Sequence, residues 1–205
     1  RTDLSQLDII ILPEGSYNSL LDKEGLERLT EWIRSGGKLI AVGSAVGNFA
    51  DKPGFSLKEN KPETTKDTTA IPNLIPYKQR ERENVKDLIT GIIVKTKLDK
   101  THPMAFGYSD EYFSLKLSGD SYSYLTDGYN IAYLQNSPEV VSGFAGSEAV
   151  KNLKNSMIFG EETLGNGSII YMVDNPLFRA FWENGKLFFA NAIFFVNNDT
   201  YRMKL

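Results

Sequence analysis

The stretch Lys38-Leu39-Ile40-Ala41-Val42-Gly43-Ser44-Ala45-Val46-Gly47 decides the fold, because it joins an apolar strand directly to a tight turn. The run from Leu39 to Val42 is typical of a strand covered on both faces in a parallel sheet. The turn after it reads Gly-x-Ala-x-Gly. In α/β enzymes, Gly-x-nucleophile-x-Gly forces the central side chain out above the sheet. Ala45 occupies that centre and has no group that can attack a substrate, so the pattern predicts a catalytic elbow without its nucleophile.

The segments before this strand predict a βαβ unit. Leu7 to Leu12 is a second apolar run, rich in isoleucine and interrupted only by Asp8, and is also expected to be a strand covered on both faces. A helix is expected after it, with Asp22 as the N-cap and a C-terminal stop at Gly36-Gly37. Leu26, Leu29 and Ile33 recur at the three- and four-residue spacing of one helix face. A right-handed crossover should therefore connect two neighbouring parallel strands.

The second half of the chain is predicted to be rich in strands and to end in a helix. Asp127-Gly128 is a strong hairpin signal between Tyr122–Leu125 and Ile131–Leu134. The other expected strands are Ile92–Val94, Tyr112–Leu117, Val140–Phe144, Met157–Gly160 and Ser168–Val173. Gly185 to Val196 has the periodicity of a helix.

Together these segments predict one α/β domain over residues 1–205, with three layers, a flavodoxin-like outline and a parallel central sheet. A polar excursion is expected at 51–67, where Lys, Glu, Pro and Thr dominate, and a β-rich insertion at about 74–135. The chain opens with Arg1, which we interpret as a sign that it is a fragment of a longer polypeptide.

Composition excludes several classes of function. A net charge of −3 without a Lys/Arg-rich block argues against nucleic acid as a partner. No apolar stretch approaches the ~20 residues of a membrane span. The chain has no cysteine, which excludes disulfides, thiolate metal sites and a cysteine nucleophile. The oligomeric state is left open.

Three of these segments, in order, resemble class I glutamine amidotransferases. Asp8-Ile-Ile-Ile-Leu-Pro-Glu-Gly15 is similar to the strand and Pro-Gly-Gly turn that supplies an oxyanion-hole amide in that family. Ala45 then stands at the family's cysteine position, and Asp174 or Asn175 at its histidine position. The resemblance implies the amidotransferase-like fold with both catalytic positions vacant. That family opens with a further strand and helix, which either lie outside this chain or are replaced by another segment.

A narrower resemblance covers most of the chain. It comprises the ordered segments Trp32–Ala41, Asp99–Tyr108, Asp174–Trp182 and Leu187–Ala192. Together they are similar to the amidotransferase-like domain that follows the catalytic domain in some large bacterial zinc carboxypeptidases. The resemblance implies a non-catalytic accessory domain whose partner is an upstream peptidase domain of the same polypeptide. That domain would hold the zinc, this chain would hold no cofactor, and the parent would be periplasmic or extracellular.

A ligand-binding module is the alternative. Open α/β sheets bind ligands at the carboxyl ends of their strands. The side chains expected at that rim are Glu14, Ser44, Asn48, Asp174 and Arg179. Such a rim would suit a small ligand, a peptide or a carbohydrate.

Catalysis by this chain has the weakest support. A serine hydrolase would need Ser44 as the nucleophile and His102, the sole histidine, as its base. Ser44 precedes the expected apex of the turn, and His102 is expected to have a structural role. One histidine cannot assemble the His-x-x-Glu and distant histidine of a carboxypeptidase zinc site, so no metal site is expected in this chain.

Overall fold

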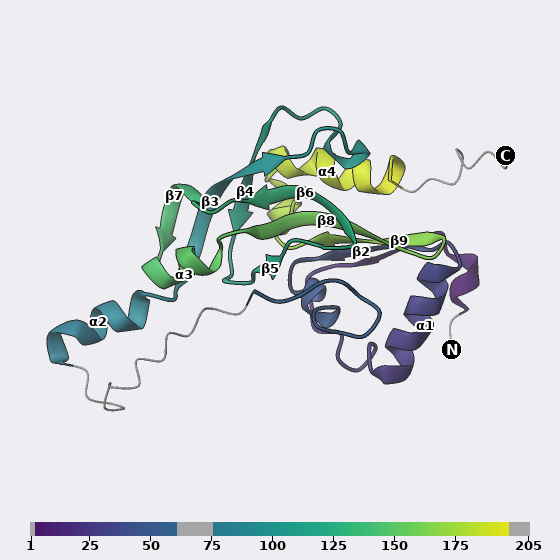
Figure 1. The fold of residues 1–205 in the computed structure, drawn as a ribbon, viewed down its shortest axis with the longest axis horizontal. Coiled ribbons are helices and arrows are strands. Elements are labelled where there is room, and N and C mark those ends of the chain that lie inside the picture. The colour runs from purple at the N-terminus through teal and green to yellow at the C-terminus, as the bar shows by residue number, and fades with distance from the viewer. Residues whose placement is uncertain (1–2, 61–75, 197–205) are drawn as a thin grey trace.

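The computed structural model describes residues 3–60 and 76–196. Within them the strands form one mixed sheet in the order β1-β2-β9-β8-β6-β3-β4, with β5 beside β8 and β7 beside β3 (Figure 1). The strands are β1 Ile9–Leu12, β2 Lys38–Val42, β3 Ile89–Leu98, β4 Glu111–Lys116, β5 Tyr122–Ser123, β6 Gly128–Leu134, β7 Glu139–Ala145, β8 Ser156–Leu164 and β9 Gly167–Met172. The α-helices are α1 Lys23–Arg34, α2 Tyr77–Val85, α3 Ser147–Asn152 and α4 Glu183–Phe194.

The expectation of a parallel sheet holds for one end of it. β1 pairs parallel with β2, and β2 pairs parallel with β9. From β9 onward the pairings with β8, β6, β3 and β4 are antiparallel. The strands β3 to β6, which fall in the expected β-rich insertion, belong to this same sheet. The domain is therefore a mixed α/β fold with a βαβ unit at one edge.

The two faces of the parallel strands carry separate cores. In β2, Leu39 and Ala41 pack with α1, whereas Ile40 and Val42 pack on the side of α4. Every residue of β2 and β9 is buried, as the continuous apolar run predicted. Figure 1 shows α1 and α4 on opposite sides of the sheet.

The helix predictions are confirmed at the N-cap of α1 and for α4. The Asp22 carboxylate accepts a hydrogen bond from the Gly25 amide at 2.8 Å and so caps α1. Helix α4 covers most of the expected 185–196 segment. The buried Lys38 ammonium donates to the carbonyls of Ala192 and Ile193 in the last turn of α4, where the helix dipole favours a cation.

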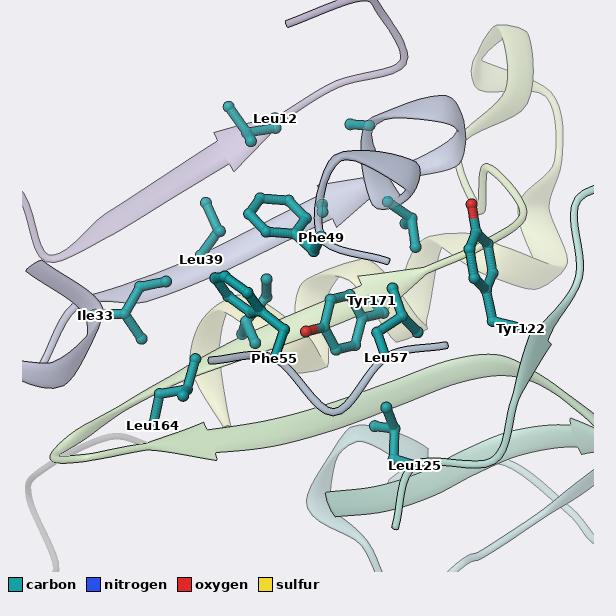
Figure 2. Packing of buried hydrophobic residues seen from close by; sticks show 14 of the residues in the cluster. Leu12, Ile33, Leu39, Phe49, Phe55, Leu57, Tyr122, Leu125, Leu164 and Tyr171 are labelled. Carbon is teal, nitrogen blue, oxygen red and sulfur yellow. The ribbon is translucent and has the colours of Figure 1, made fainter. Parts of the chain in front are cut away.

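The first part of the expected polar excursion packs onto the domain. Phe55 and Leu57 are buried in the core on the α1 side, beside Phe49 and Tyr171 (Figure 2). The Ser56 amide also donates to the buried Glu162 carboxylate at 2.7 Å. These contacts fix the segment against β8 and β9. Residues 61–67 of the excursion, and 74–75 of the expected insertion, lie outside the described residues.

The hairpin expected at Asp127-Gly128 is wrong. β5 and β6 both pair with β8 and not with each other. Gly128 does not adopt the positive φ of a type I′ turn. A Cβ at Gly128 would lie 2.5 Å from the Glu161 carbonyl oxygen, so this glycine allows β6 to approach β8 closely.

The sheet curls, and this brings its far edge back to the βαβ unit. β4 ends the sheet order, yet its Lys116 and Ser114 side chains contact Asp174, which follows β9. Tyr112, also on β4, packs against Phe188 of α4. The curl therefore closes one side of the site described next.

Candidate functional site

A recess of about 100 Å³ lies at the carboxyl ends of the three parallel strands. Glu14 follows β1, Gly43 and Ser44 follow β2, and Asp174 and Asn175 follow β9. Leu115, Leu117, Ser118, Asp120, Val173 and Phe178 complete the lining. Three of the residues predicted for this rim, Glu14, Ser44 and Asp174, are therefore brought together at one recess.

Gly43 allows Glu14 to lie over the end of β2. Gly43 has φ +58°, in the left-handed region that glycine adopts without a steric penalty. A Cβ on Gly43 would lie 2.4 Å from Glu14 Cγ, so a larger residue would displace the carboxylate. Asn175 Nδ2 donates to Glu14 Oε2 at 3.0 Å and holds it at the recess.

Asp174, which lines the recess, belongs to a buried ion pair with Lys116. Asp174 is 5% exposed, and its two oxygens accept from Lys116 Nζ at 3.0 Å and Ser114 Oγ at 2.7 Å. Lys116 is fully buried, so the carboxylate and the ammonium compensate each other's charge where water does not reach. Sequence reasoning missed Lys116, because its strand position carries no signal that an acid 58 residues away faces it.

The turn after β2 differs from the expected elbow. Residues Gly43–Asn48 form a 3₁₀ helix, in which Ala45 is fully buried in the core. Ala45 therefore does not stand above the sheet, and the exposed side chain next to the recess is that of Ser44. The residue with a positive φ in this turn is Gly43 and not the central Ala45. The side chain of Ala45 therefore points in a different direction from that of the central residue in an elbow.

Ser44 binds a backbone amide in the segment 8–15, which the family resemblance relates to an oxyanion hole. The Gly15 N–H donates to Ser44 Oγ at 3.1 Å. A backbone amide can stabilise an oxyanion only when its N–H points at the reacting oxygen. In this structure Ser44 occupies that donor, and the turn after β1 is thereby tied to the turn after β2.

His102 is engaged away from Ser44. Its Nδ1 accepts from the Met104 amide at 3.2 Å, and its Nε2 lies 2.9 Å from Glu161 Oε2 on the α4 side of the sheet. Because Nδ1 accepts, the neutral ring carries its proton on Nε2 and donates it to Glu161. Neither ring nitrogen is available to take a proton from Ser44.

The remaining two predicted rim residues lie elsewhere. Asn48 lines an adjoining recess, and its Nδ2 donates to the Ala45 carbonyl at 2.9 Å. Arg179 is exposed, with its guanidinium 5.1 Å from the centre of the Phe178 ring, and lies outside the lining of the first recess. Among the described residues, no group of three or more His, Asp or Glu side chains could hold a metal ion. No helix in the same part of the chain is long and apolar enough to cross a membrane.

Comparison with known proteins places the fold. No protein-family model and no curated protein matches the sequence. A ThuA-like protein from Parabacteroides merdae matches with a TM-score of 0.52 at 12% identity, over 94% of this chain and 71% of that chain. A cytoplasmic protein from Salmonella typhimurium matches with a TM-score of 0.50 at 14% identity, over 93% and 72%. A β-galactosidase from Rahnella matches with a TM-score of 0.49 at 14% identity, and the match spans 23% of that longer chain.

ThuA-like proteins have a class I glutamine amidotransferase-like fold, and this chain shares that fold. The expectation drawn from the motifs at residues 8–15 and 43–47 is confirmed to that extent. Identities of 12% and 14% establish the fold alone. No family model or curated relative links the chain to carboxypeptidases.

Proposed function

We propose that this domain binds a small polar ligand in the recess at the ends of β1, β2 and β9 and does not hydrolyse it. The observation that supports the proposal is the convergence of Glu14, Ser44 and Asp174 on one recess, with Asn175 orienting Glu14. Ligand sites of open α/β sheets lie at this edge.

The hydrogen bonds of the site favour binding over catalysis. Ser44 Oγ is held by the Gly15 amide, and His102 by Glu161 and Met104. A hydrolytic serine needs a free base within hydrogen-bond reach and free oxyanion donors. The described residues around the recess offer acceptors and hydroxyls, which suit recognition of a donor-rich ligand.

Binding can be tested by calorimetry and thermal shift with sugars, amino acids and short peptides. A ligand is first identified by its ability to raise the unfolding temperature of the wild type. Glu14→Gln keeps the shape of the side chain and removes its charge, so this variant should bind that ligand about tenfold more weakly than the wild type does. Glu81→Gln on the exposed helix α2 is the matched control and should bind normally. The absence of binding by every compound class would refute the proposal.

We also propose, as a second role, that the domain is an accessory domain of a secreted zinc carboxypeptidase. The ordered resemblance of Trp32–Ala41, Asp99–Tyr108, Asp174–Trp182 and Leu187–Ala192 supports it. Reading the polypeptide upstream of Arg1 tests it. A His-x-x-Glu motif with a later histidine is the expected result, and an unrelated upstream domain would rule the parent out.

A further inference from the structure

A second recess adjoins the first and shares Ser44 with it. Its volume is about 410 Å³, and its lining includes Ser16, Asn18, Asn48 and Lys52. Ser44 also lines the smaller recess that holds Glu14. The two recesses therefore meet at Ser44, and a ligand of sufficient length can contact both.

The smaller recess carries excess negative charge. Glu14 and Asp120 both line it, whereas the charge of Asp174 is compensated by Lys116. Glu14 Oε2 accepts from Asn175, but Oε1 has no hydrogen-bond donor among residues 3–60 and 76–196. An ammonium or guanidinium group would supply donors to that oxygen and offset the negative charge.

The larger recess carries the opposite charge. Lys52 lines it and is exposed, and in the part of the chain that the structure describes its ammonium has no carboxylate partner. Ser16, Asn18 and Asn48 add hydroxyl and amide groups. This combination favours an anionic group such as a carboxylate.

We propose that the ligand is a zwitterion, with a cationic group at Glu14 and Asp120 and a carboxylate at Lys52. The inference rests on the proposed binding function and narrows its ligand to amino acids, ω-amino acids or short peptides. The two recesses differ in the sign of their charge, so one orientation of such a ligand is favoured. A neutral sugar would gain nothing from this arrangement of charges.

The test is a calorimetric series on the full chain with 4-aminobutyrate, 5-aminopentanoate and 6-aminohexanoate. Hexylamine and hexanoate, which each lack one charge, are the reference compounds. One member of the series should bind about tenfold more tightly than either reference, because each charged contact contributes separately. The chain length that binds best reports the spacing of the two subsites.

Two variants assign the ends of the ligand. The Lys52→Gln variant should bind the best zwitterion no more tightly than it binds hexylamine. The Glu14→Gln variant should bind the same zwitterion no more tightly than it binds hexanoate. Lys78→Gln on exposed helix α2 is the control for lost positive charge and should keep the wild-type preference. Equal binding of the zwitterion and both references, or binding of neutral sugars alone, overturns this inference and leaves the binding function standing. Binding by no compound of any class removes both.

Discussion

At the scale of single residues, the ion pair between Lys116 and Asp174 is the most consequential contact. Neither side chain is appreciably exposed, and the two come from β4 and from the end of β9. Desolvating two charges is costly, and only their close contact and the Ser114 hydroxyl offset that cost. Removing either charged group alone should therefore destabilise the folded protein, because the other charge would stay buried without its partner.

We predict that Lys116→Met lowers the free energy of unfolding by about 3–5 kcal/mol, because it leaves the Asp174 carboxylate buried without a cation. The double variant Lys116→Met with Asp174→Asn removes both charges and should be more stable than the single variant. Urea denaturation of the four proteins measures this double-mutant cycle. Simple additivity of the two single losses would contradict the argument.

The sequence identified part of the site because strand ends are predictable. Glu14, Ser44 and Asp174 each follow an apolar run that becomes a parallel strand, and such runs end at a common edge. Lys116 could not be identified, since a lysine on a half-polar strand is normally solvated. Arg179 lies inside a separate turn, Phe178–Ala180, and itself has φ +48°, a conformation that no local sequence pattern specifies.

At the scale of elements, the turn after β2 shows what a short motif can and cannot predict. Its position at the end of a buried strand was correctly inferred, as was the glycine that starts it. The 3₁₀ conformation over Gly43–Asn48 turns Ala45 into the core, where it packs with Val46 and Phe49. Tertiary packing, which the motif does not encode, selects this conformation.

Cysteine substitution at adjacent positions tests this geometry. Ala45→Cys should give a thiol that reacts with alkylating reagents only when the protein unfolds, because position 45 is fully buried. Ser44→Cys should react rapidly in the folded protein, because Ser44 is exposed. Mass spectrometry of alkylated native and urea-unfolded samples distinguishes the two. Rapid native labelling of the residue-45 thiol would show that the turn is an elbow after all.

The pairing of the strands was less predictable than their positions. The runs at 39–42 and 169–172 are continuous and apolar, and β2 and β9 are buried on both faces as such runs predict. The run at 9–12 is equally apolar, but β1 lies at the edge of the sheet and only Leu12 is buried, so the expectation that it is covered on both faces is wrong. β5 and β6 both pair with β8, which follows them in the chain only after β7 and α3. Turn residues such as Asp127-Gly128 report only on local structure, so they do not indicate that each strand pairs with β8 and not with the other.

At the scale of the whole molecule, several tyrosines make folding sensitive to alkaline pH. Burial raises the pKa of Tyr108 to about 12 and also raises the pKa of Tyr112, Tyr122 and Tyr171. Above about pH 10 the unfolded chain releases these phenolic protons while the folded chain retains them. Stability is therefore fully present below that pH and falls as the pH rises toward the folded values. Burial lowers the pKa of Lys38, which acts in the opposite direction but is a single group.

We predict a urea midpoint that falls as the pH rises from about 10 to about 11. Tyr108→Phe should lower the midpoint at neutral pH, since its hydroxyl donates to the Asn184 carbonyl and accepts from the Phe188 amide. The same variant should flatten the alkaline slope. Tyr77→Phe, at a site that is 89% exposed, is the control and should keep the wild-type slope. A midpoint that stays constant across this range would contradict the prediction.

The hydrogen bond between Ser44 and the Gly15 amide has an evolutionary consequence. A cysteine gained at position 45 would enter the core, and a nucleophile retained at position 44 would keep the Gly15 amide occupied. The imidazole of His102 would still be bound to Glu161 and Met104. No single replacement among these three positions completes a hydrolytic constellation. Because the turns after β1 and β2 are joined through this one hydroxyl, a gain of hydrolysis would require several coordinated replacements.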